Sequence, residues 1–211
     1  MTKSWEFLAQ MSSDTAPIRE VIDRIESLNA GIATFWSTSD GWAPVAAAGL
    51  LGKSRLDWQR SLSASLRLWI RDPADALTPA ELILAWTNLG SLVEGTIKTL
   101  LSVFYETYRS DIENLKKVKA YDMAKQQARP PDGLGLEQLR SYCKARGLLG
   151  DTGGELVELV QQRRNAIHAF KDRPIGDGTE FQGAVRGYLK LLRAVNHRLP
   201  YPDEIYVPRE V

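Results

Sequence analysis

The stretch TPAELILAWTNLGSLVEGTIKTLLSVFYETY, residues 78–108, decides the fold of this chain. It opens with Thr78 as a helix N-cap, with proline at the first helical position, and with Glu81 placed to complete a capping box. Apolar side chains then recur in steps of three and four, and they are Leu82, Trp86, Leu89, Val93, Ile97, Leu100, Phe104 and Tyr108. We therefore expect one helix of about eight turns at the centre of the molecule.

Two amphipathic helices are predicted before this stretch. Apolar residues at helical spacing run from about Ala16 to Phe35, and a second set runs from Trp58 to Trp69. The segment Thr38–Ala43, which contains Ser, Asp and Gly, ends the first helix. We assign residues 1–77 to N-terminal helices that pack on a bundle formed by residues 78–211.

A basic segment, residues 116–133, follows the central helix. Its cations are Lys116, Lys117, Lys119, Lys125 and Arg129, and it ends in Pro130-Pro131-Asp132-Gly133. The proline and glycine residues end regular structure there. Before them the segment is either a frayed extension of the helix or a loop.

Three more helical segments complete the chain. A short helix is expected at Glu137–Arg146, a longer one from about Gly154 to Pro174, and a closing helix from Phe181 to about His197, before a tail at residues 199–211. No segment shows a convincing alternating pattern of a β-strand. An all-α fold, an antiparallel helical bundle, is the simplest interpretation.

Composition restricts the chemistry of the chain. It has 27 Lys and Arg against 26 Asp and Glu, so nucleic-acid binding would need local clusters of charge. Its apolar runs are too short to span a bilayer and its single cysteine excludes an internal disulfide, so we expect a cytoplasmic protein. With only Cys143, His168 and His197 as nitrogen or sulfur ligands, a closed zinc site cannot form, and we expect no metal and no cofactor.

The segment Gln162–Phe170 places two arginines and one of the two histidines on a predicted apolar helix face. That face is formed by Leu156, Val160, Ile167 and Phe170. Arg163 projects into its middle, Arg164 lies beside Val160, and His168 lies at its edge. A buried charge without a partner is very costly, and Glu94 of the central helix is the natural partner for Arg163. Lys98, one turn from Glu94, is expected to pair with Glu94 within the helix.

Arg163, four intervening residues and His168, near the end of a bundle helix, resemble the R-x(4-6)-H signature of HEPN domains. The phrases Arg163–Phe170 and Leu92–Lys98 look like those of uncharacterised bacterial members, and the resemblance covers about residues 78–202. One departure is that Arg164 stands where the family usually has a small polar residue, and Asn165 comes one position later. Either Arg163 or Arg164 could be the working arginine, and the family spacing favours Arg163.

The resemblance implies a metal-independent endoribonuclease that acts as a homodimer, with a toxin or defence effector restrained by a partner protein as the expected biological role. RNA supplies the 2′-hydroxyl nucleophile, so the protein needs a proton-transfer group and a cation. His168 would transfer protons, and Arg163 or Arg164 would bind the phosphate. The expected supporting residues are Asn165, Glu94, which would hold the arginine, and Asp172, which would orient the imidazole.

Two other interpretations remain open. A HEPN-like domain without catalysis could serve as a nucleotide-binding or protein-assembly module, which the departure at Arg164 and the low net charge favour. A plain helical interaction protein would use the arginines and His168 as a structural polar layer, with His168 capping its own helix. The basic segment 116–133 is the best local candidate for RNA binding, although a solvated flank is the more common role of such residues.

Overall fold

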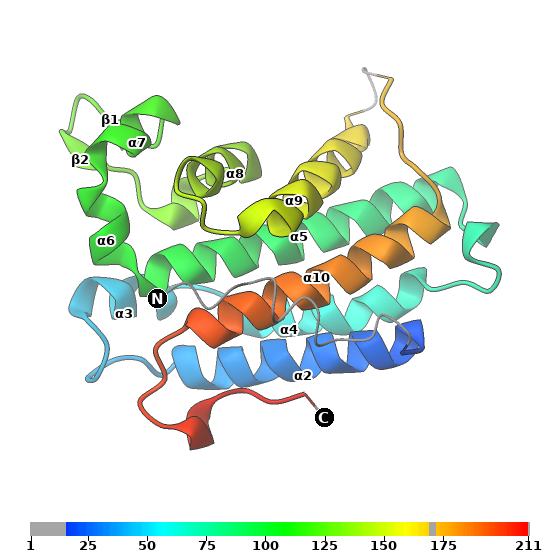
Figure 1. Ribbon diagram of the computed structural model, residues 1–211, viewed down its shortest axis with the longest axis horizontal. Helices are drawn as coiled ribbons and strands as arrows, with labels where there is room; N and C mark the ends of the chain where they lie inside the picture. Colours follow the sequence, from blue (N-terminus) through cyan, green and yellow to red (C-terminus); the bar gives the residue numbers. More distant parts are fainter. Residues whose placement is uncertain (1–15, 169–171, 211) are drawn as a thin grey trace.

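Helix α5, residues Pro79–Val103, runs along the length of the molecule, and the other long helices pack around it (Figure 1). The computed structural model describes residues 16–168 and 172–210. In this part of the chain the other helices are α2 (Ile18–Trp36), α3 (Val45–Leu51), α4 (Leu56–Ser65), α6 (Tyr105–Ser110), α7 (Ile112–Lys117), α8 (Leu136–Ala145), α9 (Gly150–Arg164) and α10 (Gly178–Arg198). The predicted all-α fold is confirmed.

The start of α5 follows the sequence signal, and its end does not. Thr78 Oγ1 accepts a hydrogen bond from the Glu81 backbone N at 3.3 Å, and Glu81 Oε2 accepts one from the Thr78 backbone N at 2.9 Å, which confirms the predicted capping box. The predicted continuation to Tyr108 is wrong, because Phe104 leaves the helical conformation and Tyr108 lies in α6. The buried Tyr108 hydroxyl donates to the Arg129 carbonyl at 2.6 Å, a tertiary contact that apolar spacing does not encode.

The N-terminal helices α2 and α4 form an antiparallel pair that packs against α5 and α10 (Figure 1). The predicted first helix is confirmed, whereas the end of the second is a 3₁₀ turn, η1 (Leu66–Trp69). Fully buried side chains from this pair and from the rest of the bundle join in one hydrophobic core; examples are Ile25, Trp86 and Phe181.

A buried polar layer crosses this core. The Tyr188 hydroxyl of α10 lies 3.0 Å from Thr96 Oγ1 of α5, and it accepts a hydrogen bond from Asn29 Nδ2 of α2 at 3.3 Å. Gln59 of α4 donates to the same hydroxyl at 3.4 Å and to the Leu92 carbonyl at 2.7 Å. Because buried polar groups are costly unless they are hydrogen-bonded, these contacts favour one relative placement of the four helices.

The C-terminal tail, residues 199–210, lies along α2 and contains the 3₁₀ turn η5 (Glu204–Tyr206). A Cβ added at Gly31 would lie 2.6 Å from Pro208 Cβ, so the glycine allows the tail to approach the helix closely. The ring of Tyr201 packs against the ring of Phe35 with centroids 5.0 Å apart. The tail therefore forms part of the packed structure.

The basic segment contains a β-hairpin that is not predicted from the sequence. After α7, strand β1 (Tyr121–Asp122) pairs antiparallel with β2 (Gln127–Ala128), and the 3₁₀ turn η3 (Pro131–Gly133) follows. Asp122 Oδ1 accepts hydrogen bonds from two backbone N–H groups of the hairpin turn at 3.0 Å. Gln126 adopts a φ of 52°, and with this residue in place of Gly the turn has no recognisable sequence signature.

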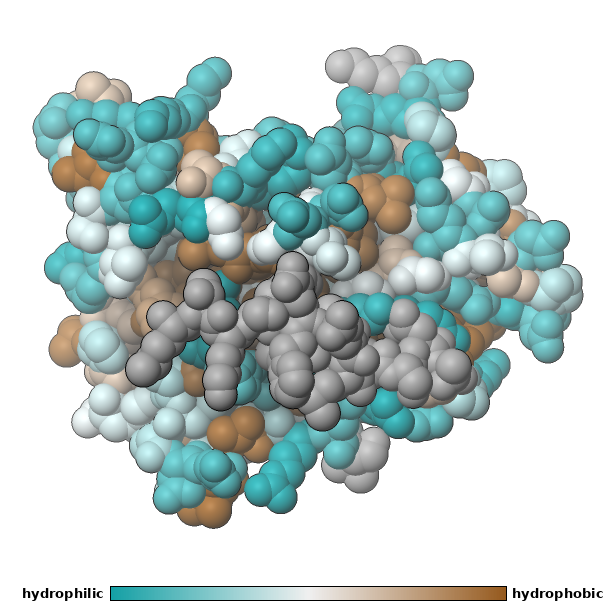
Figure 2. All heavy atoms as spheres, in the orientation of Figure 1, coloured by the Kyte–Doolittle hydropathy of each residue, from teal (hydrophilic) through white to brown (hydrophobic). Residues whose placement is uncertain are grey.

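On the face drawn in Figure 2, the visible hydrophobic residues form separate spots among hydrophilic ones. Isolated exposed apolar residues are normal on a protein surface. Within residues 16–168 and 172–210, none of the helices combines the length and the apolar character that crossing a membrane requires.

Candidate functional site

Helix α9 carries both candidate arginines in its last turn. The predicted continuation to Pro174 is wrong, because the helix ends at Arg164 and the 3₁₀ turn η4 (Asn165–Ile167) follows. His168 comes next in an extended conformation, with φ −86° and ψ 91°. Helix α9 runs antiparallel to α5, and η4 also packs on α5 (Figure 1). Phe170, the last residue of the predicted apolar face, lies outside the described residues.

Arg163 pairs with Glu180, in the first turn of α10. Its Nε and Nη2 donate to the two carboxylate oxygens of Glu180 at 2.7 and 2.9 Å, and its Nη1 donates to the Pro174 carbonyl at 3.0 Å. The proposed pairing of Arg163 with Glu94 is therefore wrong. Bidentate pairs of this kind are among the stronger hydrogen-bonded contacts in proteins. They tie the segment that follows α9 to the start of α10.

Gly176 makes room for this pair. Its φ is +69°, a conformation that residues with a Cβ rarely adopt. A Cβ built there would lie 1.9 Å from Glu180 Oε2 and 3.1 Å from Arg163 Nε. Any side chain at this position would displace the ion pair.

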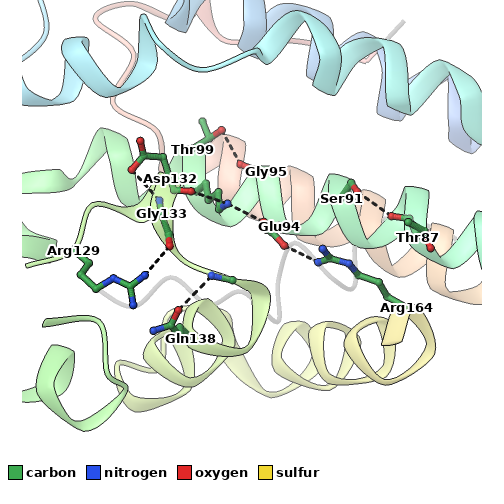
Figure 3. Close-up of polar contacts among 12 residues, drawn as sticks. Thr87, Ser91, Glu94, Gly95, Thr99, Arg129, Asp132, Gly133, Gln138 and Arg164 are labelled. Carbon is green, nitrogen blue, oxygen red and sulfur yellow. Dashed lines mark hydrogen bonds and ion pairs between the residues drawn. The ribbon is translucent and has the colours of Figure 1, made fainter. Parts of the chain in front are cut away.

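Arg164 is the arginine that pairs with Glu94. Its Nη1 donates to Glu94 Oε2 at 2.6 Å, and Glu94 Oε1 accepts from Lys98 Nζ at 2.8 Å (Figure 3). The predicted pair of Lys98 and Glu94 within α5 is confirmed. Lys98 also donates to the Asp132 carbonyl at 3.1 Å. The Glu94 carboxylate thus forms ion pairs with two cations, Lys98 of the same helix and Arg164 of α9.

Gly90 of α5 lies beneath the Arg164 side chain. A Cβ added at Gly90 would lie 2.5 Å from Arg164 Cδ. Glycine weakens a helix interior by roughly 1 kcal/mol relative to alanine, so its presence there has a local cost. The close approach of the arginine to the helix backbone is the physical reason for this glycine.

The surroundings of Glu94 favour its charged form. Burial alone would raise the pKa of this carboxyl, but hydrogen bonds from Lys98 and Arg164 and the charges of both groups outweigh burial, so the pKa of Glu94 lies below its usual value. The carboxylate is therefore ionised at neutral pH and holds Arg164 in place.

His168 is exposed, and its ring makes no hydrogen bond, ion pair or ring contact with the described residues. Its backbone N donates to the carbonyl of Asn165, the C-cap of α9, at 3.3 Å. Asp172 is also exposed and makes no hydrogen bond to the imidazole within the described part of the chain. The imidazole is thus accessible to a ligand.

The candidate RNA-binding cations lie far from His168. They follow α6 at one end of the molecule, whereas α9 ends in the opposite half of its long axis (Figure 1). Lys116 Nζ lies 5.1 Å from the ring centroid of Tyr121, and Arg129 Nη2 donates to the Gly133 carbonyl at 3.1 Å. The remaining cations of this group are Lys117, Lys119 and Lys125. In one chain, the basic segment and the arginines do not form a common site.

Metal-ligating side chains do not cluster in residues 16–168 and 172–210, where no three His, Cys, Asp or Glu residues could jointly hold a metal ion. Cys143 is not a candidate nucleophile either. It is buried, and burial raises the pKa of its thiol to about 12. A thiol of this kind is protonated at neutral pH and is a poor nucleophile.

Three residues that shape this site were not predicted from the sequence: Glu180, Gly90 and Gly176. For Gly90 the available signal was an isolated glycine within a helical pattern, which usually has a packing reason. Glu180 was detectable as the acidic residue three positions after the potential N-cap Asp177, whose Oδ1 accepts from the Glu180 backbone N at 2.8 Å.

Searches of protein-family models, of curated proteins and of solved structures found no match to this chain. Its function therefore has to be inferred from the residues themselves. The strongest local arrangement is an exposed imidazole that follows two ion-paired arginines.

Proposed function

We propose that this protein is a metal-independent endoribonuclease of the HEPN type, in which Arg164 and His168 are the working pair. The observation that carries the proposal is the arrangement at the end of α9. Arg164 is positioned by Glu94 at 2.6 Å, and one 3₁₀ turn later comes the exposed His168, whose imidazole makes no hydrogen bond or ion pair with the described residues. RNA is the substrate class.

The choice of Arg164 rests on the availability of its N–H groups. Arg163 has the family spacing, but it donates three hydrogen bonds to Glu180 and Pro174, and its side chain is 15% exposed. The Arg164 side chain is 31% exposed and donates through one nitrogen to Glu94. Arg164 can therefore bind a phosphate oxygen without leaving its partner, and Arg163 acts as a positioning residue.

The proposed reaction is an internal transesterification of RNA. The 2′-oxygen loses its proton to a base and attacks the neighbouring phosphorus, while the bond from phosphorus to the 5′-oxygen breaks and that oxygen takes up a proton. The products are a 2′,3′-cyclic phosphate and a 5′-hydroxyl. His168 transfers one of the two protons, and Arg164 stabilises the charge that builds on the phosphate.

A homodimer completes this reaction, because it would supply the second proton-transfer group as His168 of the partner subunit. Ile167, which is 45% exposed, directly precedes His168 and could contribute to the subunit contact. A toxin or defence effector restrained by a partner protein remains the biological setting that fits such an activity. Light scattering of the active protein checks the dimer.

The test is incubation of the purified protein with RNA in EDTA, followed by analysis of the RNA ends. We expect cleavage that leaves 2′,3′-cyclic phosphate, and loss of cleavage in His168→Ala and Arg164→Ala. His197→Ala is the matched control, because His197 lies in the last turn of α10 and is also exposed. Equal cleavage by the His168 and His197 variants contradicts the proposal.

A second candidate function is a HEPN-like module that has lost catalysis and assembles with a protein or nucleotide. The observation in its favour is that both arginines already have carboxylate partners, and that of Arg163 is bidentate. This second function predicts that the protein cleaves none of the RNAs tested and that the Arg164→Ala variant folds normally.

A further inference from the structure

A pocket of about 230 Å³ lies between the loop that joins α3 to α4 and the outer side of α5. Leucines Leu50, Leu51 and Leu56 form an apolar part of its wall. Its volume is below the roughly 300 to 1,000 Å³ of pockets that enclose drug-sized ligands, so it suits a small molecule.

Three cations line this pocket: Lys53, Arg55 and Lys98. Lys53 is exposed, and within the described residues its side chain has no ion pair or hydrogen bond. Arg55 is held in place, because Nε donates to Asp57 Oδ1 at 2.8 Å and the guanidinium lies 4.1 Å from the centroid of the Trp58 ring. Asp57 and Glu94 form ion pairs with Arg55 and Lys98, so among these three cations Lys53 is the one without an ion pair to the described residues.

One carboxylate, that of Asp132, also lines the pocket. Its Oδ1 accepts a hydrogen bond from the Gly133 backbone N at 2.9 Å, which fixes the side chain beside α5 (Figure 3). An ionised carboxylate is an acceptor only, so it favours a ligand that carries hydroxyl or amine donors. A fully anionic ligand without donors would be repelled by it.

These groups together select a ligand with a phosphate at one end and hydroxyl groups at the other. We propose that the pocket binds a sugar phosphate, with its phosphate against Lys53, Arg55 and Lys98 and a sugar hydroxyl donating to Asp132. The same chemical unit occurs as a free sugar phosphate and within an RNA strand.

The pocket is linked to the candidate site through Glu94. Its two carboxylate oxygens hold Lys98, which lines the pocket, and Arg164, which does not. A bound phosphate that attracts Lys98 would weaken the ion pair between Lys98 and Glu94. The ion pair between Glu94 and Arg164 would then become stronger. This link to cleavage rests on the proposed function, whereas binding in the pocket does not.

The test is calorimetric titration of the full-length protein with ribose 5-phosphate, with inorganic phosphate and with ribose. We expect ribose 5-phosphate to bind more tightly than either of its parts. Lys53→Met should weaken its binding about tenfold, which corresponds to about 1.4 kcal/mol. Asp132→Asn should weaken the binding of ribose 5-phosphate but not the binding of inorganic phosphate. Lys144→Met, at an exposed lysine of α8 that does not line the pocket, is the control and should change the binding of neither ligand.

Absence of ribose 5-phosphate binding by the unmodified protein overturns the proposal, and so does an equal loss of binding in the Lys53 and Lys144 variants. Circular dichroism confirms that each variant is folded. Repeating the titration on the His168→Ala variant with an RNA oligonucleotide that keeps its 2′-hydroxyl groups identifies the source: competition assigns the pocket to RNA, and unchanged affinity assigns it to a free sugar phosphate. The titration with ribose 5-phosphate contains no cleavable RNA, so failure of the proposed ribonuclease activity leaves that result unaffected.

Discussion

At the scale of single residues, two glycines hold the arginines where they are. Gly90 leaves space for the stem of Arg164, and Gly176 leaves space for the pair of Arg163 and Glu180. Neither glycine belongs to the motif that identifies the arginines. Replacing either glycine by a residue with a side chain therefore displaces one arginine without substituting it, and so tests the role of that arginine's position.

Gly90→Ala should reduce RNA cleavage with little effect on stability. The added Cβ would push Arg164 away from Glu94, and the weaker ion pair would cost about 1 kcal/mol. Alanine in place of glycine would stabilise the helix by roughly 1 kcal/mol, so the two effects would offset each other. Guanidinium unfolding and a cleavage assay measure the two effects. Gly183→Ala in α10 is the control, because a Cβ there meets nothing within 4 Å. Full activity of the Gly90 variant would show that the position of Arg164 does not matter.

Glu94→Gln should lower stability at neutral pH and make no difference in acid. The folded-state pKa of Glu94 is below its usual value, so the carboxylate stabilises the fold at pH values above the unfolded pKa of about 4.3, and this contribution is lost as pH falls through the folded pKa. The expected difference at pH 7 is about 1 kcal/mol, because the pair is partly exposed. Urea unfolding of both proteins at pH 7 and pH 3 measures it, and a constant difference would contradict the assignment.

At the scale of helices, long-range contacts decide where α5 and α9 end. The capping box of Thr78 and Glu81 is local, and the sequence predicts it correctly. The ends at Val103 and Arg164 lack such local signals, since apolar spacing continues beyond both. The carboxylate partners of the arginines are equally non-local, because sequence spacing cannot distinguish Glu94 from Glu180 across two helices. Lys98 and Glu94, which lie four apart on one helix, are predictable.

Gly176→Ala should destabilise the junction between α9 and α10 more than backbone strain alone explains. A left-handed conformation costs a residue with a Cβ about 1–2 kcal/mol, and here the Cβ also meets Glu180 Oε2. Gly147→Ala is the matched control, with a φ of +58° and no atom within 4 Å of its Cβ. Thermal unfolding compares the two variants, and hydrogen exchange of residues 172–180 reports the junction. An equal loss in both variants would assign the effect to strain alone.

At the scale of the whole molecule, the C-terminal tail, residues 199–210, contacts both α2 and α10. Asn196 Nδ2 donates to the Pro208 carbonyl at 3.1 Å, and the Tyr201 hydroxyl donates to Asn196 Oδ1 at 2.7 Å. Arg193 of α10 forms an ion pair with Glu210. These contacts join residues that lie 5 to 17 positions apart in the sequence.

Truncation after Leu199 should lower the melting temperature. Loss of the tail contacts with α2 and Asn196 should cost at least about 1 kcal/mol, which corresponds to roughly 2–4 °C for a chain of this size. Ile205→Ser is the control, because Ile205 is 76% exposed. Differential scanning calorimetry makes the comparison, and an unchanged melting temperature for the truncated chain would show that the tail contacts contribute nothing.

The polar layer in the core has a consequence for how this sequence can evolve. Asn29, Gln59, Thr96 and Tyr188 come from four different helices, and each supplies a hydrogen bond that another one needs. Replacing one of them leaves a buried polar group without a partner, whereas replacing several by apolar residues removes the need for all of them. Among descendants of this sequence, these four positions are therefore expected to covary as a group.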